Sequence, residues 1–321
     1  MKKAFKIIAV ILAVAIVISG VVIGITKKEE CNYFFSAMHN AQVKISDGTW
    51  KDDINGEGSS GSNGNAQSSF VADTYGGIEF KSVDDVVNYY VQAYDKTKAD
   101  TAVYVDEEGN EQVCYALVGD EKLTITNVLV DGKDNPIINN VVPTIVDSIF
   151  TSGVYGLPPC ANRDSKNDVD ENGDSLLTSR IKPEDIENCS VVDNGDGTIT
   201  LTLIPKKCDM SHRGMDSQGK MFNALGAIDK TVESIEMLSW ATGSTSENCL
   251  VTYENGTAVV KIDTNSGKIV EADYDMKVTV TVSHANILVI KDKSASLTVD
   301  YIQHFPASDE FIKESKGLVR K

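Results

Sequence analysis

Positive charge is scarce in this sequence. Its 30 lysine and arginine residues stand against 47 aspartate and glutamate residues, which gives the 321-residue chain a formal net charge of −17. Nucleic acids and anionic lipid surfaces are bound through basic patches. The composition therefore argues against nucleic acid or an anionic lipid surface as a partner, and it is typical of an acidic, soluble exterior.

Motifs of common enzymes are also missing. The four histidines lie outside H-E-x-x-H and triad-like patterns. Ser266-Gly267-Lys268 lacks the earlier glycine of a phosphate-binding loop and is interpreted as a hairpin turn. We therefore expect no enzyme activity and no cofactor.

The cysteines contain no C-x-x-C pair, which argues against a zinc ribbon or a redox motif. In an exported chain six cysteines allow up to three disulfides, with 15 connectivities for a full set, and buried free thiols are the alternative. Both remain open from the sequence. The six are Cys31, Cys114, Cys160, Cys189, Cys208 and Cys249.

One long apolar run lies near the N-terminus. Residues 7–25 contain 19 positions without a charge, close to the ~20 that a membrane-spanning helix needs. Lys2, Lys3 and Lys6 precede this run, so the positive-inside rule predicts a single-pass protein of the cell membrane with a cytoplasmic N-terminus. The C-terminal domain is then extracytoplasmic. A cleaved signal peptide is the alternative, although no clean small-x-small cleavage site follows.

Composition divides the chain into four parts. Residues 1–26 are the cytoplasmic tip and transmembrane signal anchor, and residues 27–69 are a juxtamembrane segment ending in a linker rich in Gly, Ser and Asn. Such a linker cannot bury apolar area and behaves as flexible coil. Residues 70–305 form the extracytoplasmic domain, and residues 306–321 a C-terminal tail.

Helical patterns occur at three places in the domain. Ser82 and Asp85 resemble a capping box for a helix with an apolar face extending to Tyr94. Residues 136–151 and 219–239 show the same period. These helices are expected to cover a sheet.

Strand patterns fill most of the remaining sequence. TAVYV, EQVCYALV and KLTITNVLV predict a three-stranded antiparallel meander, and SVVDNGDGTITLTLI predicts a hairpin. LVTYENGTAVVKI predicts a second hairpin, because Asn255-Gly256 is a strong turn signal.

The longest strand pattern covers residues 269–283. Seven apolar residues, from Val270 to Val282, occupy every even position, and the pattern continues from Ala295 to Phe305 with Gln303 as its one break. This alternation predicts strands with one dry and one wet face. The fold class is therefore α+β, with a long, twisted antiparallel sheet covered on one face by helices.

The dry face is the candidate binding site. If the helices do not close on it, a lipid or another elongated apolar ligand is expected to fill the gap. If they do, the domain is a structural or interaction domain of the cell envelope with a filled core, and a cell-envelope protein is its partner. The candidate lining residues are Tyr274, Met276, Val278, Val280, Tyr301 and Phe305. The apolar hairpin tip 287–290 is a further candidate contact with a membrane, a partner or the mouth of a cavity.

The layout of residues 82–305 resembles the half-barrel of bacterial lipoprotein carriers, the LolA and LppX-like group. VKIDTNSGKIVEADYDM, residues 260–276, resembles the strand, turn and strand around a D-x-x-T-G turn common among such exported domains. The chain also resembles uncharacterised membrane-anchored exported proteins of Gram-positive anaerobes. The resemblance implies an extracytoplasmic location and, for the carriers, transport of lipid. A lipobox is missing, because Lys28, Glu29 and Glu30 precede Cys31.

An acidic stretch, DSKNDVDENGDS at residues 164–175, is the one candidate metal site. Asp168, Asp170, Asn172 and Asp174 match the first half of a calcium loop, with Gly173 at its sharp turn. The second half fails, because Ser179 stands where a bidentate glutamate closes the shell. We interpret the stretch as a solvated acidic loop and keep calcium as the alternative.

Overall fold

The computed structural model describes most of the chain after the predicted linker. The described ranges are residues 70–134, 156–159, 169–170, 172–224, 233, 238–287 and 290–321. Within them, no helix is long and apolar enough to cross a membrane. The predicted span at residues 7–25 and the predicted helix at 136–151 lie outside these ranges.

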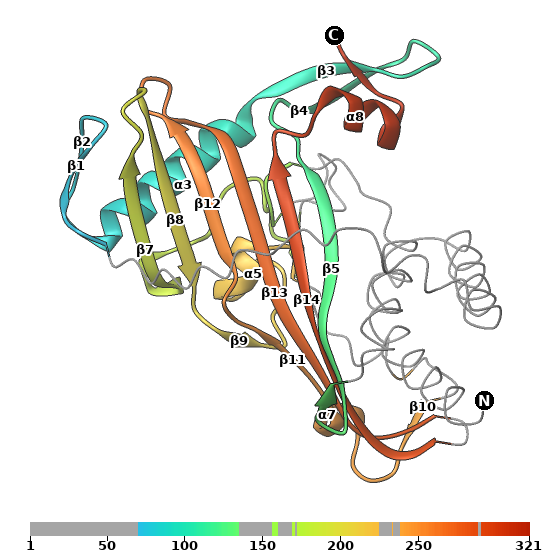
Figure 1. The fold of residues 1–321 in the computed structure, drawn as a ribbon. Helices are drawn as coiled ribbons and strands as arrows, with labels where there is room; N and C mark the ends of the chain where they lie inside the picture. Colours follow the sequence, from blue (N-terminus) through green and yellow to red (C-terminus); the bar gives the residue numbers. More distant parts are fainter. Residues whose placement is uncertain are drawn as a thin grey trace.

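A large antiparallel sheet dominates the structure (Figure 1). Its main path runs in the order β6-β5-β14-β13-β12-β8-β7, and β9, β10 and β11 join it off this path. These strands are β5 (Asp120–Val130), β6 (Lys133–Asp134), β7 (Ile186–Asp193), β8 (Thr198–Pro205), β9 (Cys208–Asp209), β10 (Leu238–Trp240), β11 (Cys249–Tyr253), β12 (Thr257–Asp263), β13 (Lys268–Ile287) and β14 (Ile290–Phe305).

The remaining elements are short except for one helix. They are β1 (Asp73–Tyr75), β2 (Ile78–Phe80), α3 (Val83–Ala99), β3 (Thr101–Val105), β4 (Glu111–Tyr115), η3 (Pro183–Asp185), α5 (Ser217–Met221), α7 (Thr245–Asn248), α8 (Asp309–Lys316) and β15 (Val319–Arg320). The predicted helix at 219–239 differs at both described ends, because α5 stops at Met221 and Leu238 begins a strand.

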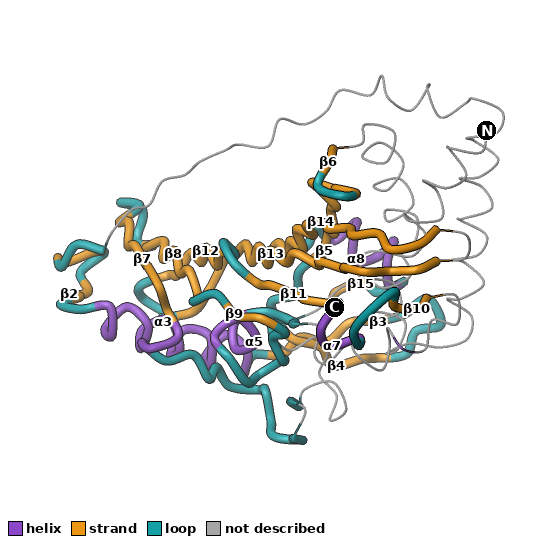
Figure 2. Tube along the Cα trace, turned by 90° about the horizontal axis from the view of Figure 1, so that it is seen from below, coloured by secondary structure: helices purple, strands orange, loops and turns teal. Residues whose placement is uncertain are grey.

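Helix α3 packs on one face of the large sheet (Figure 2). It begins as predicted, because Ser82 accepts a hydrogen bond from Asp85 N and the Asp85 side chain accepts from Ser82 N. Its apolar stripe, which includes Val86 and Tyr90, is buried against the sheet. At its last turn the Thr97 hydroxyl accepts a hydrogen bond from Ile269 N of β13 at 2.8 Å.

The predicted alternation of β13 is confirmed from Ala272 to Val282. Every even residue in this span is at most 4% exposed. Val270 departs from the pattern, because it is 42% exposed while Ile269 is buried. The register between β12 and β13 shifts at Lys261 and Ile262, so Val270 is an extra residue on β13 and the alternation changes face there.

The predicted hairpin around Asn255-Gly256 is wrong. β11 and β12 do not pair with each other; both pair antiparallel with β13, β11 opposite Val278–Val282 and β12 opposite residues 268–275. Asn255 adopts a left-handed conformation with φ 60°, and a Cβ on Gly256 would lie 2.9 Å from Asp275 O. The Asn-Gly pair therefore interrupts one long strand rather than reversing the chain.

The predicted three-stranded meander is wrong in its third strand. β3 and β4 pair with each other, but β5 pairs with β14 in the large sheet. The third strand of the small sheet is β15, which comes from the predicted C-terminal tail. In that segment Ser308 caps α8, and Ile312 and Leu318 are buried beside Tyr104. Residues 306–321 thus form part of the fold.

Candidate functional site

The predicted ligand-lining residues lie on the face of the large sheet that meets α3. Tyr274 is 1% exposed, and its hydroxyl lies 3.0 Å from the hydroxyl of Tyr90 on α3. The Tyr90 hydroxyl also lies 3.6 Å from the Met221 sulfur. The Phe305 ring, 0% exposed, meets the Tyr274 ring edge to face with centroids 6.0 Å apart. At this end the helix and neighbouring side chains fill the space over the sheet.

Burial continues along the dry face beyond Tyr274. Met276, Val278 and Val280 are 3%, 2% and 3% exposed, and Tyr301 is partly buried. Burial raises the pKa of Tyr274 well above its usual value, so its hydroxyl stays neutral. Gln303, the predicted break in the pattern, is also buried on this face, at 2% exposed. The structure therefore brings the predicted residues together, but within a packed core.

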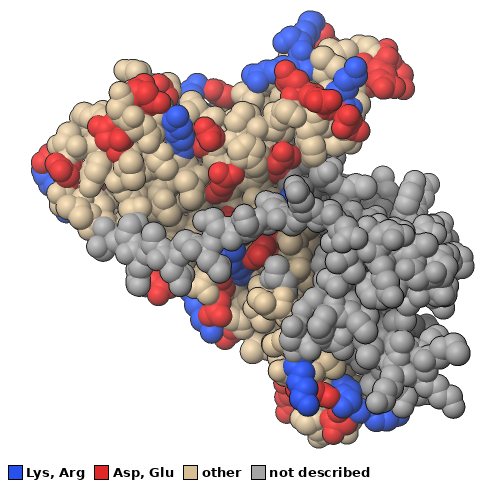
Figure 3. Space-filling view, viewed as in Figure 1, with Lys and Arg blue, Asp and Glu red and all other residues tan. Residues whose placement is uncertain are grey.

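The opposite face of the sheet is polar. Figure 3 shows single acidic and basic side chains scattered among uncharged residues on this face. Lys277 forms ion pairs of 2.8 Å with Asp275 and 3.2 Å with Asp300. Burial raises the pKa of Asp275, against the effect of Lys277. The wet face thus carries an ion-pair network across two neighbouring strands.

His304 on this face is paired with a carboxylate of the neighbouring strand. His304 Nδ1 lies 2.7 Å from a carboxylate oxygen of Asp273, and this hydrogen bond raises the pKa of His304. Both side chains are about half exposed, so water screens their interaction.

Among the described residues, no group of three or more His, Cys, Asp or Glu side chains is placed to hold a metal ion.

Part of the acidic loop is described. Asp170 is 6% exposed, and one of its oxygens accepts hydrogen bonds from the backbone N–H groups of Asn172 and Asp174. Its other oxygen lies 2.5 Å from Arg180 Nη1. Burial opposes ionisation of Asp170, but these partners hold its pKa below the usual value. Asp168 lies outside the described residues.

Residues 170–174 form a tight turn that is held together by hydrogen bonds between Asp170 and the backbone of Asn172 and Asp174. Gly173 has φ 85°, as the predicted sharp turn requires, and Asn172 and Asp174 are exposed. Because both oxygens of Asp170 already have protein partners, a calcium ion at this carboxylate would compete with Arg180.

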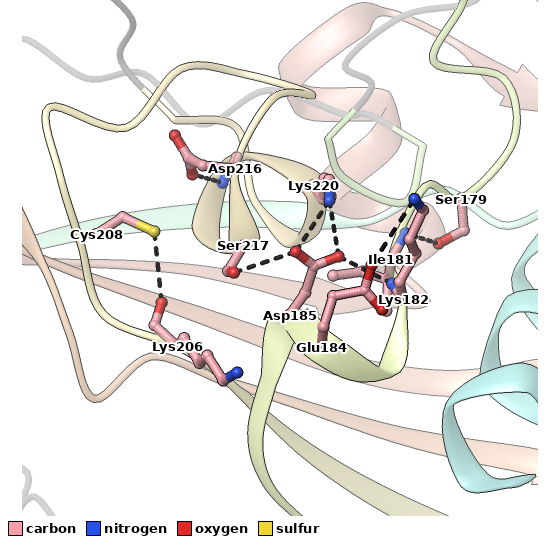
Figure 4. Close-up of polar contacts among 11 residues, drawn as sticks. Ser179, Ile181, Lys182, Glu184, Asp185, Lys206, Cys208, Asp216, Ser217 and Lys220 are labelled. Carbon is pink, nitrogen blue, oxygen red and sulfur yellow. Dashed lines mark hydrogen bonds and ion pairs between the residues drawn. The ribbon is translucent and has the colours of Figure 1, made fainter. Parts of the chain in front are cut away.

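A polar cluster around Asp185 was missed by the sequence reasoning (Figure 4). The Asp185 carboxylate, at the end of η3, accepts hydrogen bonds of 2.9 and 2.8 Å from Lys220 Nζ on α5. The Ser217 hydroxyl donates to it at 3.2 Å, and Lys182 N donates at 2.9 Å. The cluster therefore ties α5 to the turn that leads into β7.

The sequence signal for this cluster is the spacing Ser217-x-x-Lys220, which places both side chains on one face of a helix turn. The same spacing occurs in enzymes in which lysine assists a serine nucleophile. Here Lys220 Nζ and the Ser217 hydroxyl both donate hydrogen bonds to the Asp185 carboxylate, so both side chains are directed at that carboxylate. The arrangement is that of a structural ion pair.

Two of the described cysteines carry thiols outside any disulfide. Burial raises the pKa of Cys189 to about 11. Burial also raises the pKa of Cys208, whose thiol donates to Lys206 O at 3.6 Å. Since the thiolate is the reactive form, neither residue has the character of a reactive cysteine.

Comparison with protein-family models, with curated proteins and with solved structures found no match to this chain.

Proposed function

We propose that this chain is a non-catalytic interaction domain of the cell envelope, with a core filled by its own side chains. In this proposal the long twisted sheet is the wall of a half-barrel-like domain, covered on one face by helices. Residues 7–25 form the transmembrane signal anchor, so the domain lies outside the cell membrane. Its partner is another protein of the envelope.

The burial of the predicted ligand-lining face carries this proposal. Tyr274, Val280 and Phe305 are each at most 3% exposed, because other side chains of the same chain cover them. A binding cavity would leave such side chains facing open space, because apolar ligand sites are largely formed in advance. The lipid-carrier hypothesis needs this face to open, and the contact between Tyr90 and Tyr274 weighs against that.

The absence of an enzyme role is part of the same proposal. Lys220 Nζ and the Ser217 hydroxyl both donate to Asp185, which is the arrangement of a structural ion pair rather than of a serine activated by a lysine. The thiol of Cys208 has a raised pKa. Both observations support a binding or structural role over catalysis.

Protease added to intact host cells tests the location. We expect digestion of the domain that follows the anchor, while a cytoplasmic marker protein stays intact. Complete protection of the domain in cells whose isolated protein is readily cleaved would contradict the proposed topology.

A further inference from the structure

The break between β11 and β12 contains one residue more than the strand opposite. Tyr253, the last residue of β11, lies opposite Val278 of β13. Thr257, the first residue of β12, lies opposite Asp275. The three residues 254–256 therefore span a stretch that takes only two residues on β13, which is the arrangement of a β-bulge. This bulge contains an Asn-Gly pair.

An asparagine followed by glycine converts without an enzyme. The backbone nitrogen of the glycine attacks the side-chain carbonyl carbon of the asparagine and closes a succinimide ring. The side-chain nitrogen leaves as ammonia with the proton that the backbone nitrogen gives up. Water then opens the ring at either of its two carbonyl carbons and yields aspartate or isoaspartate, with no oxidant or reductant. Glycine favours the attack because it has no side chain to shield its nitrogen.

The Asn172-Gly173 pair is restrained against this reaction. Gly173 N donates a hydrogen bond to Asp170 O at 3.0 Å, and Asn172 N donates to the Asp170 carboxylate at 2.8 Å. The Gly173 nitrogen must leave Asp170 before it attacks. The folded chain therefore slows ring closure at this turn.

The Asn194-Gly195 pair is restrained at both of its reacting groups. Gly195 N donates a hydrogen bond to the Asp193 carboxylate at 2.8 Å. Asn194 Nδ2 lies 2.9 Å from the Thr198 hydroxyl and 3.0 Å from the Thr200 hydroxyl. Attack here requires these hydrogen bonds to break as well.

The Asn255-Gly256 pair differs from both. Asn255 is exposed, and within the described part of the chain neither its side chain nor Gly256 N has a hydrogen-bond partner. Ring closure requires rotation about the Asn255 Cα–C bond, and no hydrogen bond of Gly256 N opposes that rotation. Exposure also gives water access to the ring that forms.

From these differences we propose that Asn255 is a site of spontaneous modification, at which the folded protein forms aspartate and isoaspartate faster than at Asn172 and Asn194. The conversion adds one negative charge beside Glu254. Isoaspartate also adds one atom to the backbone between β11 and β12. The inference goes beyond the proposed interaction role and does not depend on it.

The test follows all three sites in one sample. The full-length chain in mild detergent is incubated at mildly alkaline pH, and conversion at each site is measured over time by mass spectrometry of its peptides. We expect Asn255 to convert roughly tenfold faster than Asn172 or Asn194, because those two sites must first break hydrogen bonds and the rate depends exponentially on the barrier. Asn55 and Asn63, which are also followed by glycine, lie outside the described residues.

Unfolding provides the matched control. In concentrated urea we expect the three sites to convert at similar rates, because each is an Asn-Gly pair without its folded restraints. In the folded chain, Asp193→Ala removes the acceptor of Gly195 N. We expect this variant to convert severalfold faster at Asn194 and at an unchanged rate at Asn255.

Three results would overturn the inference. The first is conversion at Asn172 or Asn194 in the folded chain as fast as at Asn255. The second is conversion at Asn255 only after the protein is unfolded. The third is an unchanged rate at Asn194 in the Asp193→Ala variant, which would show that the hydrogen bond to Gly195 N does not restrain the reaction.

Discussion

Enlarging a side chain on the dry face separates a filled core from a ligand cavity. Val280 is 3% exposed and lies between Val251 of β11 and Leu297 of β14, each 1% exposed. Val280→Phe adds four carbon atoms at this place. In a packed core such a change forces neighbouring side chains from their preferred rotamers and costs about 1–3 kcal/mol. In a cavity that awaits a ligand, the ring would enter empty space and cost little.

The neighbouring residue supplies the matched control. Thr281 points to the opposite, exposed face, beside Leu250, which is 46% exposed. Thr281→Phe adds a ring of the same size without crowding the core, and exposed substitutions usually change stability by less than about 0.5 kcal/mol. In thermal unfolding followed by intrinsic fluorescence, we expect Val280→Phe to melt roughly 2–12 °C lower than the control, given about 2–4 °C per kcal/mol for a domain of this size. Equal melting temperatures, or a more stable Val280→Phe, would refute the filled core.

Three further substitutions probe individual interactions. Tyr274→Phe removes the hydroxyl that meets Tyr90, and we expect a loss of about 1 kcal/mol in the free energy of unfolding measured with urea, since the Tyr90 hydroxyl keeps the Met221 sulfur nearby; no change would mean that the two hydroxyls do not interact. Lys220→Met leaves the Asp185 carboxylate without its cation, and we expect a loss of roughly 3 kcal/mol in the same assay, while Lys182→Met, at an exposed lysine, should be neutral. Millimolar calcium should leave the melting temperature of the protein unchanged. Asp170→Ala should lower the melting temperature with or without calcium, because it removes the partner of Arg180. A calcium-dependent rise in melting temperature that Asp170→Ala abolishes would establish the metal site. The pKa of Asp170 is lowered in the folded protein, so the ionised carboxylate stabilises the fold at neutral pH. This stabilisation is lost as the pH falls below about 4 through the folded pKa. The stability of the Asp170→Ala variant should therefore depend less on pH in that range.

Local patterns predicted the elements whose partners are close in sequence. The capping box at Ser82 and the hairpin of β7 and β8 follow from side chains within a few residues of each other. The alternation of β13 also predicted which side chains from Ala272 to Val282 would be buried. In each case the same residues form the element and its buried face, so a short window of sequence was sufficient.

Long-range pairing decided the features that the sequence did not reveal. Asn255-Gly256 has a strong hairpin propensity, but β13 is long enough to pair with both flanking strands, and these pairs outweigh the local turn. The extra residue Val270 is visible only through the register with β12. The Asp185 cluster joins residues 35 apart in sequence, and the Ser217-x-x-Lys220 spacing does not reveal that Asp185 is their common partner. Tertiary contacts of this kind override propensity in strands more readily than in helices.

The measurement that most directly tests the filled core is an analysis of what the protein carries from its own host. The full-length chain is purified with mild detergent, extracted with organic solvent, and the extract is examined by mass spectrometry against a parallel extract of an unrelated single-pass protein. We predict no apolar molecule enriched over that control, because Tyr274, Met276 and Val280 are buried by the protein itself. A lipid or other elongated apolar molecule recovered at about one per chain would contradict the account and favour a carrier whose dry face opens around its ligand.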